Sequence, residues 1–404
     1  MDATKKNITI YTVNMAIRQV ANLCSTGILM QTFLASLGFS SDLLYINHSI
    51  VLSAQILTSA VCSRWADKGN LLRRATLIQL PSVLLLLCYL PFCLTGQADT
   101  TTFAILTAIS FLHCMFYFMF SVCDYKLPYF IMPASSYSTV LSVSGVLSAL
   151  ISLLSGVLIS IGTQYMPFSH LMFIACSVAA VLDLVAMITT SRLKLLIHPE
   201  MAVHNKGETD KSSVTVMQLF RTPLFYRLAP ANFLRGVSYG ATSVLAALAL
   251  DLGYDTTVTT SIVSVQAAAM LLGSFVFGFL SKKMKPRTLI LCGTLSMLLL
   301  PLMLIRNSTL FLVLVGLVIF GRIMVDHGFP FLLRQAVPLE ISGPFNAWRL
   351  ILFFVALVST TTIAAWIPVE VLLIIGTASQ VYVGIVAFTD KELSAHLQPD
   401  QIQQ

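Results

Sequence analysis

Twelve long apolar stretches run through this chain of 404 residues, each about as long as a helix that crosses a bilayer. A spanning helix needs about 20 consecutive apolar residues. Apolar residues make up 57% of the chain and charged residues 10%, whereas soluble proteins carry about 25% charged residues. So few charges do not cover the surface of a water-exposed globule. The sequence therefore excludes a soluble fold and predicts an all-α polytopic membrane protein.

The predicted spans are residues 8–37, 44–63, 75–94, 102–123, 139–161 and 169–190, followed by 225–250, 257–280, 288–305, 310–331, 345–367 and 371–388. We expect an N-terminal six-helix bundle over 1–190, a polar cytoplasmic linker over 191–223, a C-terminal six-helix bundle over 224–389 and a cytoplasmic tail over 390–404. Polar residues 1–7 lead into the first span without a small-residue cleavage site, which predicts no removable signal peptide.

The basic residues are distributed unevenly between the two sides of the predicted bundle. Nineteen fall on the side that holds both termini: Lys5, Lys6, Arg64, Lys68, Arg73, Arg74, Lys126, Arg192, Lys194, Lys206, Lys211, Arg221, Arg227, Lys282, Lys283, Lys285, Arg287, Arg334 and Lys391. The other side holds only Arg306. Because cytoplasmic loops are enriched in Lys and Arg, both termini are predicted to be cytoplasmic, and the net charge of +7 reports topology rather than nucleic-acid binding.

Motifs for metals and nucleotides are missing from the sequence. All eight cysteines lie in apolar spans or at their edges, with no C-x-x-C spacing, so no disulfide, metal site or cofactor is expected. No Gly-x-x-x-x-Gly-Lys-Ser/Thr motif is present to bind ATP phosphates. Any transport is therefore expected to be secondary or passive.

The two halves of the chain share landmarks at matching places. Leu37-Gly38-Phe39 before the second span corresponds to Leu252-Gly253-Tyr254 before the eighth. At the ends of spans four and ten, the segment from Asp124 to Pro128 parallels the segment from Asp326 to Pro330. Matching Gly, Asp and Pro landmarks in two places indicate an internal repeat.

With its two tandem six-span halves and a basic linker, the chain resembles the major facilitator superfamily along its whole length. The family motif between spans two and three is Gly-x-x-x-Asp-Arg-x-Gly followed by basic residues, and the segment from Ser63 to Arg74 keeps the Asp and the basic cluster. It departs in Ser63 for Gly and Lys68 for Arg. The second-half counterpart begins at Gly278 and has Lys282 where Asp is expected.

In the family, these loops pack against the opposite half and their charged network breaks as the halves rock. The resemblance implies that role for Asp67, Lys68, Arg73, Arg74, Lys282, Lys283 and Arg287. The alternative is that these residues only hold short loops on the cytoplasmic side by their charge.

Ionisable residues within spans cost at least ~2.5 kcal/mol each on insertion scales, so each is a functional hypothesis. Seven matter here: Arg18, Asp124, Asp183, Arg235, Arg322, Asp326 and Arg349. The resemblance implies that spans one, four, seven and ten line the central cavity, and five of the seven fall on these spans. Asp183 lies on span six, which is peripheral in the family, and is expected to pair with a neighbour.

The repeat predicts an ion pair between Arg18 and Asp124 in one half and between Arg235 and Asp326 in the other. Arg322 and Asp326, four residues apart, share a helical face. Arg18, Arg235, Arg322 and Arg349 are candidate substrate-binding residues, and their excess positive charge favours an anionic or zwitterionic small-molecule substrate. The alternative is that the pairs only stabilise each half.

Protons are the expected coupling ion, carried by Asp124, Asp326 and His327, with His113 as a further candidate. The sequence thus predicts a monomeric secondary transporter of a small polar solute, with uptake favoured, in the lipid bilayer of a bacterial inner membrane. A proton-driven efflux pump for drugs or metabolites is the alternative within this class. A membrane enzyme would need a motif such as H-E-x-x-H, which is absent, and a receptor or scaffold would be expected to carry a soluble domain.

Overall fold

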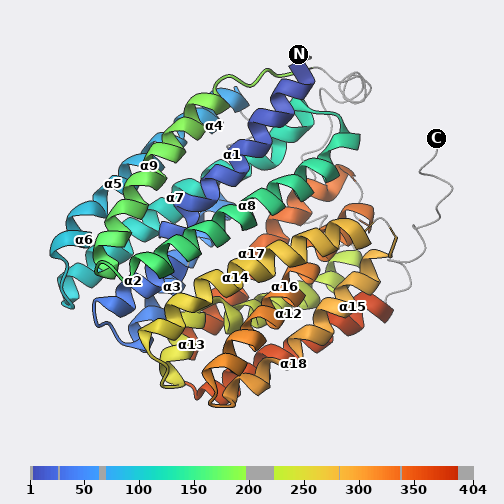
Figure 1. Ribbon diagram of the computed structural model, residues 1–404. Helices are drawn as coiled ribbons and strands as arrows, with labels where there is room; N and C mark the ends of the chain where they lie inside the picture. Colours follow the sequence, from blue (N-terminus) through green and yellow to red (C-terminus); the bar gives the residue numbers. More distant parts are fainter. Residues whose placement is uncertain are drawn as a thin grey trace.

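The computed structural model describes residues 3–25, 28–62, 70–196, 223–281, 283–336 and 339–389. These residues form a bundle of helices, and the all-α prediction is confirmed (Figure 1). The helices before residue 196 are here called the first half and those after residue 223 the second half. In Figure 1 the first half lies at the upper left and the second half at the lower right.

Each predicted span contains one or more helices. In the first half these are α1 (Ala3–Ser25), α2 (Ile28–Ser36), α3 (Ser41–Cys62), α4 (Leu71–Leu77), α5 (Gln79–Cys88), α6 (Leu90–Thr95), α7 (Thr100–Ile131), α8 (Ala134–Gly162) and α9 (Phe168–Thr190). In the second half they are α12 (Pro223–Ser243), α13 (Leu245–Asp251), α14 (Thr256–Leu280), α15 (Pro286–Met297), the 3₁₀ helix η2 (Leu300–Leu304), α16 (Ser308–Ala336), α17 (Leu339–Ala364) and α18 (Val369–Thr389).

Eight of the described helical segments are long and apolar enough to cross a membrane, and nine if a bent pair in span seven counts as one span. The bend in span seven separates α12 from α13 by 58°. It falls at Val244, whose φ of −116° and ψ of 56° are not helical. The helix hydrogen bonds are interrupted there, so backbone carbonyls of the last turn of α12 become available to side chains.

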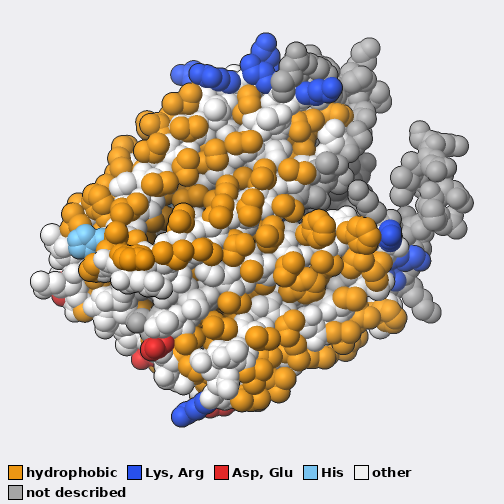
Figure 2. All heavy atoms as spheres, in the orientation of Figure 1, with side chains coloured by type: hydrophobic (Ala, Val, Ile, Leu, Met, Phe, Trp, Pro, Cys, Tyr) orange, Lys and Arg blue, Asp and Glu red, His pale blue; other side chains and the backbone are white. Residues whose placement is uncertain are grey.

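Basic and acidic side chains lie mainly at opposite ends of the bundle. One end, here called the basic end, carries Lys5, Lys6, Arg73, Arg74, Arg192, Lys194, Lys283, Lys285 and Arg287. The opposite end, here called the acidic end, carries Asp42, Asp99, Asp251, Asp255 and Glu370 together with Arg306. Figure 2 shows the band of hydrophobic side chains that separates the two ends. Such a band between two charged rims is what a bilayer requires of an embedded surface.

The two halves pack together most extensively toward the acidic end. There one large apolar cluster contains residues of both halves, including Phe33, Leu44, Leu245 and Phe311. Toward the basic end, the described residues form separate clusters, one around Phe120 and Leu127 in the first half and the other around Phe225 and Phe329 in the second. The helix pairs with the most contact between the halves are α8 with α14 and α3 with α17, and α2 and α3 also contact α13 and α2 contacts α14.

Hydrogen bonds between the halves follow the same pattern. Tyr45 Oη donates to Asp251 Oδ2 at 3.0 Å, and Ser49 Oγ donates to Thr361 Oγ1 at 2.7 Å. Both bonds lie in the part of the bundle near the acidic end. The structure is therefore closed between the halves on the acidic side.

Candidate functional site

The first cluster of buried charge joins α1 to α9. Arg18 and Asp183 are 3% and 1% exposed, and Arg18 Nε lies 3.6 Å from Asp183 Oδ1. The predicted pair of Arg18 with Asp124 is therefore wrong, because Asp183 on span six takes the arginine. The expectation that Asp183 pairs with a neighbour is confirmed.

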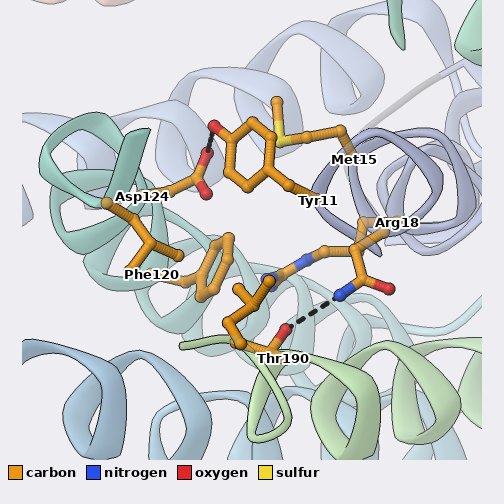
Figure 3. Close-up of a pocket in the computed structure, with 9 residues that line it drawn as sticks. Tyr11, Met15, Arg18, Phe120, Asp124 and Thr190 are labelled. Carbon is orange, nitrogen blue, oxygen red and sulfur yellow. Dashed lines mark hydrogen bonds between the residues drawn. The ribbon is translucent and has the colours of Figure 1, made fainter. Parts of the chain in front are cut away.

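Asp124 lies close to this pair without joining it. Its Oδ2 accepts a hydrogen bond from Tyr11 Oη at 3.1 Å. Arg18, Asp124 and Tyr11 line one small cavity, together with Asn14, Met15, Phe120, Leu127, Thr190 and Leu193 (Figure 3). The cavity encloses about 10 Å³, which is roughly the room that one water molecule needs.

The surroundings of the Arg18 guanidinium are mainly aromatic. Its central carbon lies 3.3 Å from the ring centroid of Phe120 and 5.7 Å from that of Tyr117. None of its three nitrogens makes a hydrogen bond to any described residue. Arginine usually makes several such bonds when buried, so this cation is held by one long ion pair and by ring faces.

Asp183 continues into a chain of hydrogen bonds through the interior. Its Oδ2 accepts from Ser82 Oγ on α5 at 3.1 Å, and Ser82 Oγ lies 2.9 Å from His113 Nε2 on α7. Ser82 is 1% exposed and His113 is fully buried. Nothing in the sequence placed these residues with Asp183, because they lie on three helices far apart along the chain.

The second cluster of charge joins α12 to α16. Arg235 Nη2 lies 3.2 Å from Asp326 Oδ1, so the predicted pair is confirmed. Arg322 Nε lies 3.8 Å from Asp326 Oδ2, so these residues do share a helical face. The three side chains are 12–19% exposed, which makes this cluster more accessible than the first.

Arg322 also reaches the break in span seven. Its Nη1 donates to the Thr242 carbonyl at 3.3 Å, and its guanidinium carbon lies 3.1 Å from the ring centroid of Tyr239. From the first half, Gln31 Nε2 donates to the Ser243 carbonyl at 3.2 Å. The break thus brings polar groups of both halves together.

His48 is a further polar residue that sequence reasoning missed. It lies on α3 in the first half, is 8% exposed and is within electrostatic reach of Arg322. Its Nε2 makes no hydrogen bond to the described part of the chain. A histidine in an apolar span was the available signal, but hydropathy does not reveal that α3 faces the second half.

A row of five aromatic rings connects the two arginine clusters across the halves. In order, the rings are Tyr117 and Phe118 on α7, Phe354 and Phe353 on α17, and Tyr239 on α12. Successive ring centroids lie 5.7, 5.6, 5.2 and 5.3 Å apart. The first ring contacts Arg18 and the last contacts Arg322. Movement between the halves must therefore repack rings that touch both clusters.

The second cavity also encloses about 10 Å³. Its lining residues are Arg235, Ser238, Tyr239, Met297, Arg322, Val325, Asp326 and Gln380. Ser238 Oγ makes no hydrogen bond to described residues, although the side chain is 1% exposed. Each of these two cavities has room for about one water molecule in this conformation, so neither holds a larger solute.

The other predicted site residues lie outside the two cavities. The Arg349 carbonyl accepts a hydrogen bond from Asn232 Nδ2. His327 Nε2 lies 3.4 Å from Ser274 Oγ, and its ring lies 5.1 Å from that of Phe277 on α14. Among the described residues, no group of three or more His, Cys, Asp or Glu is arranged to hold a metal ion.

The predicted gating loops are described in part. Arg73 and Arg74 lie in α4, whose first turn is capped by Asn70 Oδ1 accepting from the Arg73 N–H at 3.0 Å. Lys283 Nζ lies 4.5 Å from the ring centroid of Phe279, and Arg287 lies in the first turn of α15. Asp67, Lys68 and Lys282 lie outside the described residues.

Comparison with known proteins gives one family. The family profile of the Major Facilitator Superfamily matches residues 10–325. No curated protein sequence matches the chain significantly.

Solved structures resemble the fold over almost the whole chain. A D-xylose–proton symporter has a TM-score of 0.71 at 10% identity, covering 96% of this chain and 98% of its own. A bacterial homologue of the iron transporter ferroportin, outward-facing with soaked iron, has a TM-score of 0.68 at 13% identity, covering 98% and 100%. The nucleoside transporter NupG has a TM-score of 0.67 at 11% identity, covering 97% and 100%. At these identities, the likeness concerns the fold.

Proposed function

The chain belongs to the major facilitator superfamily of membrane transporters, and we propose that it moves a small anionic solute across the membrane by alternating access, driven by protons. The observation that carries this proposal is the charged cluster of Arg235, Arg322 and Asp326. It lies inside a membrane protein, it remains partly exposed, and Arg235 contacts Phe353, which packs with residues of the first half.

An anionic solute suits the charge of this cluster. Two guanidinium groups face one carboxylate, so the cluster keeps one positive charge in excess. An ion inside a bilayer is costly without a counter-ion, and a carboxylate or phosphate group would supply one through charge-assisted hydrogen bonds. Arg18 and Arg349 are proposed to add to the positive charge along the route of the solute.

Alternating access is supported by how the halves pack. Described residues of both halves share one apolar cluster toward the acidic end and form separate clusters toward the basic end. This arrangement corresponds to a transporter closed on the acidic side. We propose that the N-terminal bundle (1–190) and the C-terminal bundle (224–389) rock about this contact, joined by the linker at 191–223.

The proposed coupling residues include two carboxylates that lie beside arginines. Asp326 lies between Arg235 and Arg322, and Asp124 accepts from Tyr11 beside Arg18. Protonation of Asp326 would free Arg235 and Arg322 for the solute, which ties proton binding to solute binding. His327 is the third proposed coupling residue. The D-xylose–proton symporter shares the fold, and we extend its proton coupling to this chain as part of the proposal.

We propose that the basic end faces the cytoplasm, because Lys and Arg are retained on that side of membrane proteins. The proposed location is the bacterial inner membrane, with uptake as the direction. The loops at this end are proposed to act as gates through Asp67, Lys68, Arg73, Arg74, Lys282, Lys283 and Arg287.

A ligand screen followed by flux measurement tests the function. Purified protein is screened by thermal shift against carboxylates, phosphates, sugars and nucleosides, and we expect stabilisation by an anionic compound. That compound is then supplied to proteoliposomes with an imposed pH gradient, where we expect accumulation. Binding without accumulation would indicate a receptor, and accumulation only against the uptake direction would indicate an efflux pump.

A further inference from the structure

We propose that Asp183 is a proton-binding site supplied by His113 through Ser82, and that its protonation passes Arg18 from Asp183 to Asp124. The site lies inside the first half, away from the solute cluster around Arg235. It rests on the proposed proton coupling for its role in transport, but the proton site itself is defined by side-chain contacts.

The cost of burying these groups indicates a function. Arg18, Asp183, Ser82 and His113 are all 3% exposed or less. Arg18 makes no hydrogen bond and Asp183 Oδ1 makes none, although the two face each other at 3.6 Å. A buried ion pair stabilises a protein only when its geometry is good and its remaining hydrogen bonds are made. This pair is poorly satisfied and therefore ready to exchange partners.

The two hydrogen bonds that join His113, Ser82 and Asp183 are donated in the same direction, toward Asp183. Ser82 Oγ donates to Asp183 Oδ2, so its lone pair is free to accept from His113 Nε2. This assigns the Nε2–H tautomer to the neutral ring and leaves Nδ1 as an acceptor. His113 Nδ1 has no partner among the described residues, so this nitrogen is available to accept a proton.

A proton can then move from His113 through Ser82 to Asp183 without a change in any other residue. It binds at His113 Nδ1, the Nε2 proton passes to Ser82 Oγ, and the Ser82 hydroxyl proton passes to Asp183 Oδ2. The histidine returns to a neutral tautomer, the serine keeps one proton, and the carboxylate becomes neutral. One proton has been taken up at His113 Nδ1, and one proton has been bound by Asp183.

The second half shows that the fold itself does not need this carboxylate. In the second half, neutral groups join spans nine and twelve: Gln380 Nε2 donates to Thr294 Oγ1 at 3.3 Å. Gln380 lines the cavity beside Arg235 as Asp183 lies beside Arg18. A neutral amide and a hydroxyl therefore complete the same helix contact. The negative charge at Asp183 is an addition specific to the first half.

Protonation of Asp183 removes the counter-ion of Arg18. The titratable and charged groups that face Asp183 are Arg18 from α1 and His113, Tyr117 and Asp124 from α7, while Arg73 and Arg74 of α4 lie at the basic end. The helices α2, α5, α6 and α8 carry no charged residue. Asp124 is therefore the available new partner for the arginine. It shares a water-sized cavity with Arg18, with the Phe120 ring between them (Figure 3).

A double-mutant cycle tests the exchange without any solute. We expect Asp183→Asn and Asp124→Asn each to shift the melting temperature in detergent by a few degrees, because the remaining carboxylate takes Arg18. The double variant should lose more than the sum of the single shifts, because Arg18 then has no counter-ion. Asp183→Asn combined with Asp326→Asn is the matched control and should be additive, because Asp326 belongs to the other cluster.

Two outcomes would overturn the exchange. One is an additive cycle for Asp183 and Asp124. The other is failure of Asp183→Asn alone to fold, with folding restored when Arg18→Met is added, because Asp124 would then not have replaced Asp183.

The relay is tested by the carboxylic C=O stretching band of protonated Asp183. After a downward pH jump, this infrared band should appear in the wild type and be missing in Asp183→Asn. In Ser82→Ala and His113→Ala it should appear about a hundredfold more slowly, the lower range for a positioned proton-transfer group. Ser110→Ala is the control, because Ser110 bonds Tyr89 at 2.8 Å elsewhere on α7. Equal rates in all variants would overturn the relay, even if proton-driven transport itself were established.

Discussion

Arg18 Nε lies 3.6 Å from Asp183 Oδ1 in the interior of the first half, with the two side chains 3% and 1% exposed. The pair joins the first and sixth spans, and its arginine stacks on Phe120. A charge pair so deeply buried contributes to stability only while both members are present.

Removal of the arginine from this pair should be costly, and removal of both charges should be tolerated. We expect Arg18→Met to lower the free energy of unfolding by roughly 3–5 kcal/mol, because Asp183 is left buried and unpaired. The double variant Arg18→Met, Asp183→Leu should recover most of this loss. Chemical unfolding in detergent measures both, and a double variant less stable than Arg18→Met would contradict the account.

The arginines of the second cluster should determine solute affinity. We expect Arg235→Ala and Arg322→Ala to weaken binding of the anionic solute by roughly 30-fold each, the equivalent of about 2 kcal/mol for a lost charge-assisted bond. Isothermal titration of the purified variants measures this. Arg306→Ala, an exposed arginine at the acidic end, is the control and should bind as the wild type does. Unchanged affinity in both cluster variants would show that these arginines only stabilise the second half.

The contact between Ser49 and Thr361 offers a direct test of closure at the acidic end. Their hydroxyl oxygens lie 2.7 Å apart, so Ser49→Cys with Thr361→Cys should form a disulfide under mild oxidation, since disulfide formation requires such proximity. Oxidation should abolish solute flux and reduction should restore it. Ser53→Cys with Thr361→Cys is the control, because Ser53 lies one turn further along α3 and bonds its own helix at Ile50. Solute flux that continues after oxidation of this pair would contradict the opening of this contact during transport.

The assignment of the basic end to the cytoplasm is tested by thiol labelling in intact cells. A cysteine in place of Arg306 should react with a membrane-impermeant maleimide from outside. A cysteine in place of Lys285 should react only after permeabilisation. Both positions are exposed at opposite ends of the bundle, so each serves as the control of the other. The reverse pattern would invert the proposed orientation.

Much of the fold follows from the sequence because apolar length alone defines spanning helices. The structure extends several of them: α7 continues from its predicted end at residue 123 to Ile131, which puts Asp124 inside a helix. The break at Val244 was not predicted. A single non-helical residue among apolar neighbours leaves hydropathy unchanged, so no sequence pattern marks it.

The sequence predicts one of the two charge pairs correctly and the other wrongly. Arg235 and Asp326 were paired correctly, and the repeat then suggested the same pairing for Arg18 and Asp124. The repeat failed because the first half has a second carboxylate, Asp183, which takes Arg18, whereas Gln380 beside Arg235 in the second half is neutral. Rotation of a uniformly apolar helix about its axis decides which charge faces which, and composition does not reveal that rotation.

Neutral polar groups were the least predictable part of the site. Ser82, Gln31 and Ser238 carry no charge and are common within apolar helices, so none stands out until the helices are packed. Their importance comes from partners on other helices, such as Asp183 for Ser82 and the Ser243 carbonyl for Gln31.

Proton-driven accumulation in proteoliposomes tests the central claim most directly. With the solute found by the ligand screen, an imposed pH gradient should drive accumulation by the wild type and none by Asp326→Asn. Solute exchange without a gradient should persist in the same variant, because exchange needs binding and rocking but no proton release. Gradient-driven accumulation by Asp326→Asn equal to that of the wild type would contradict the claim.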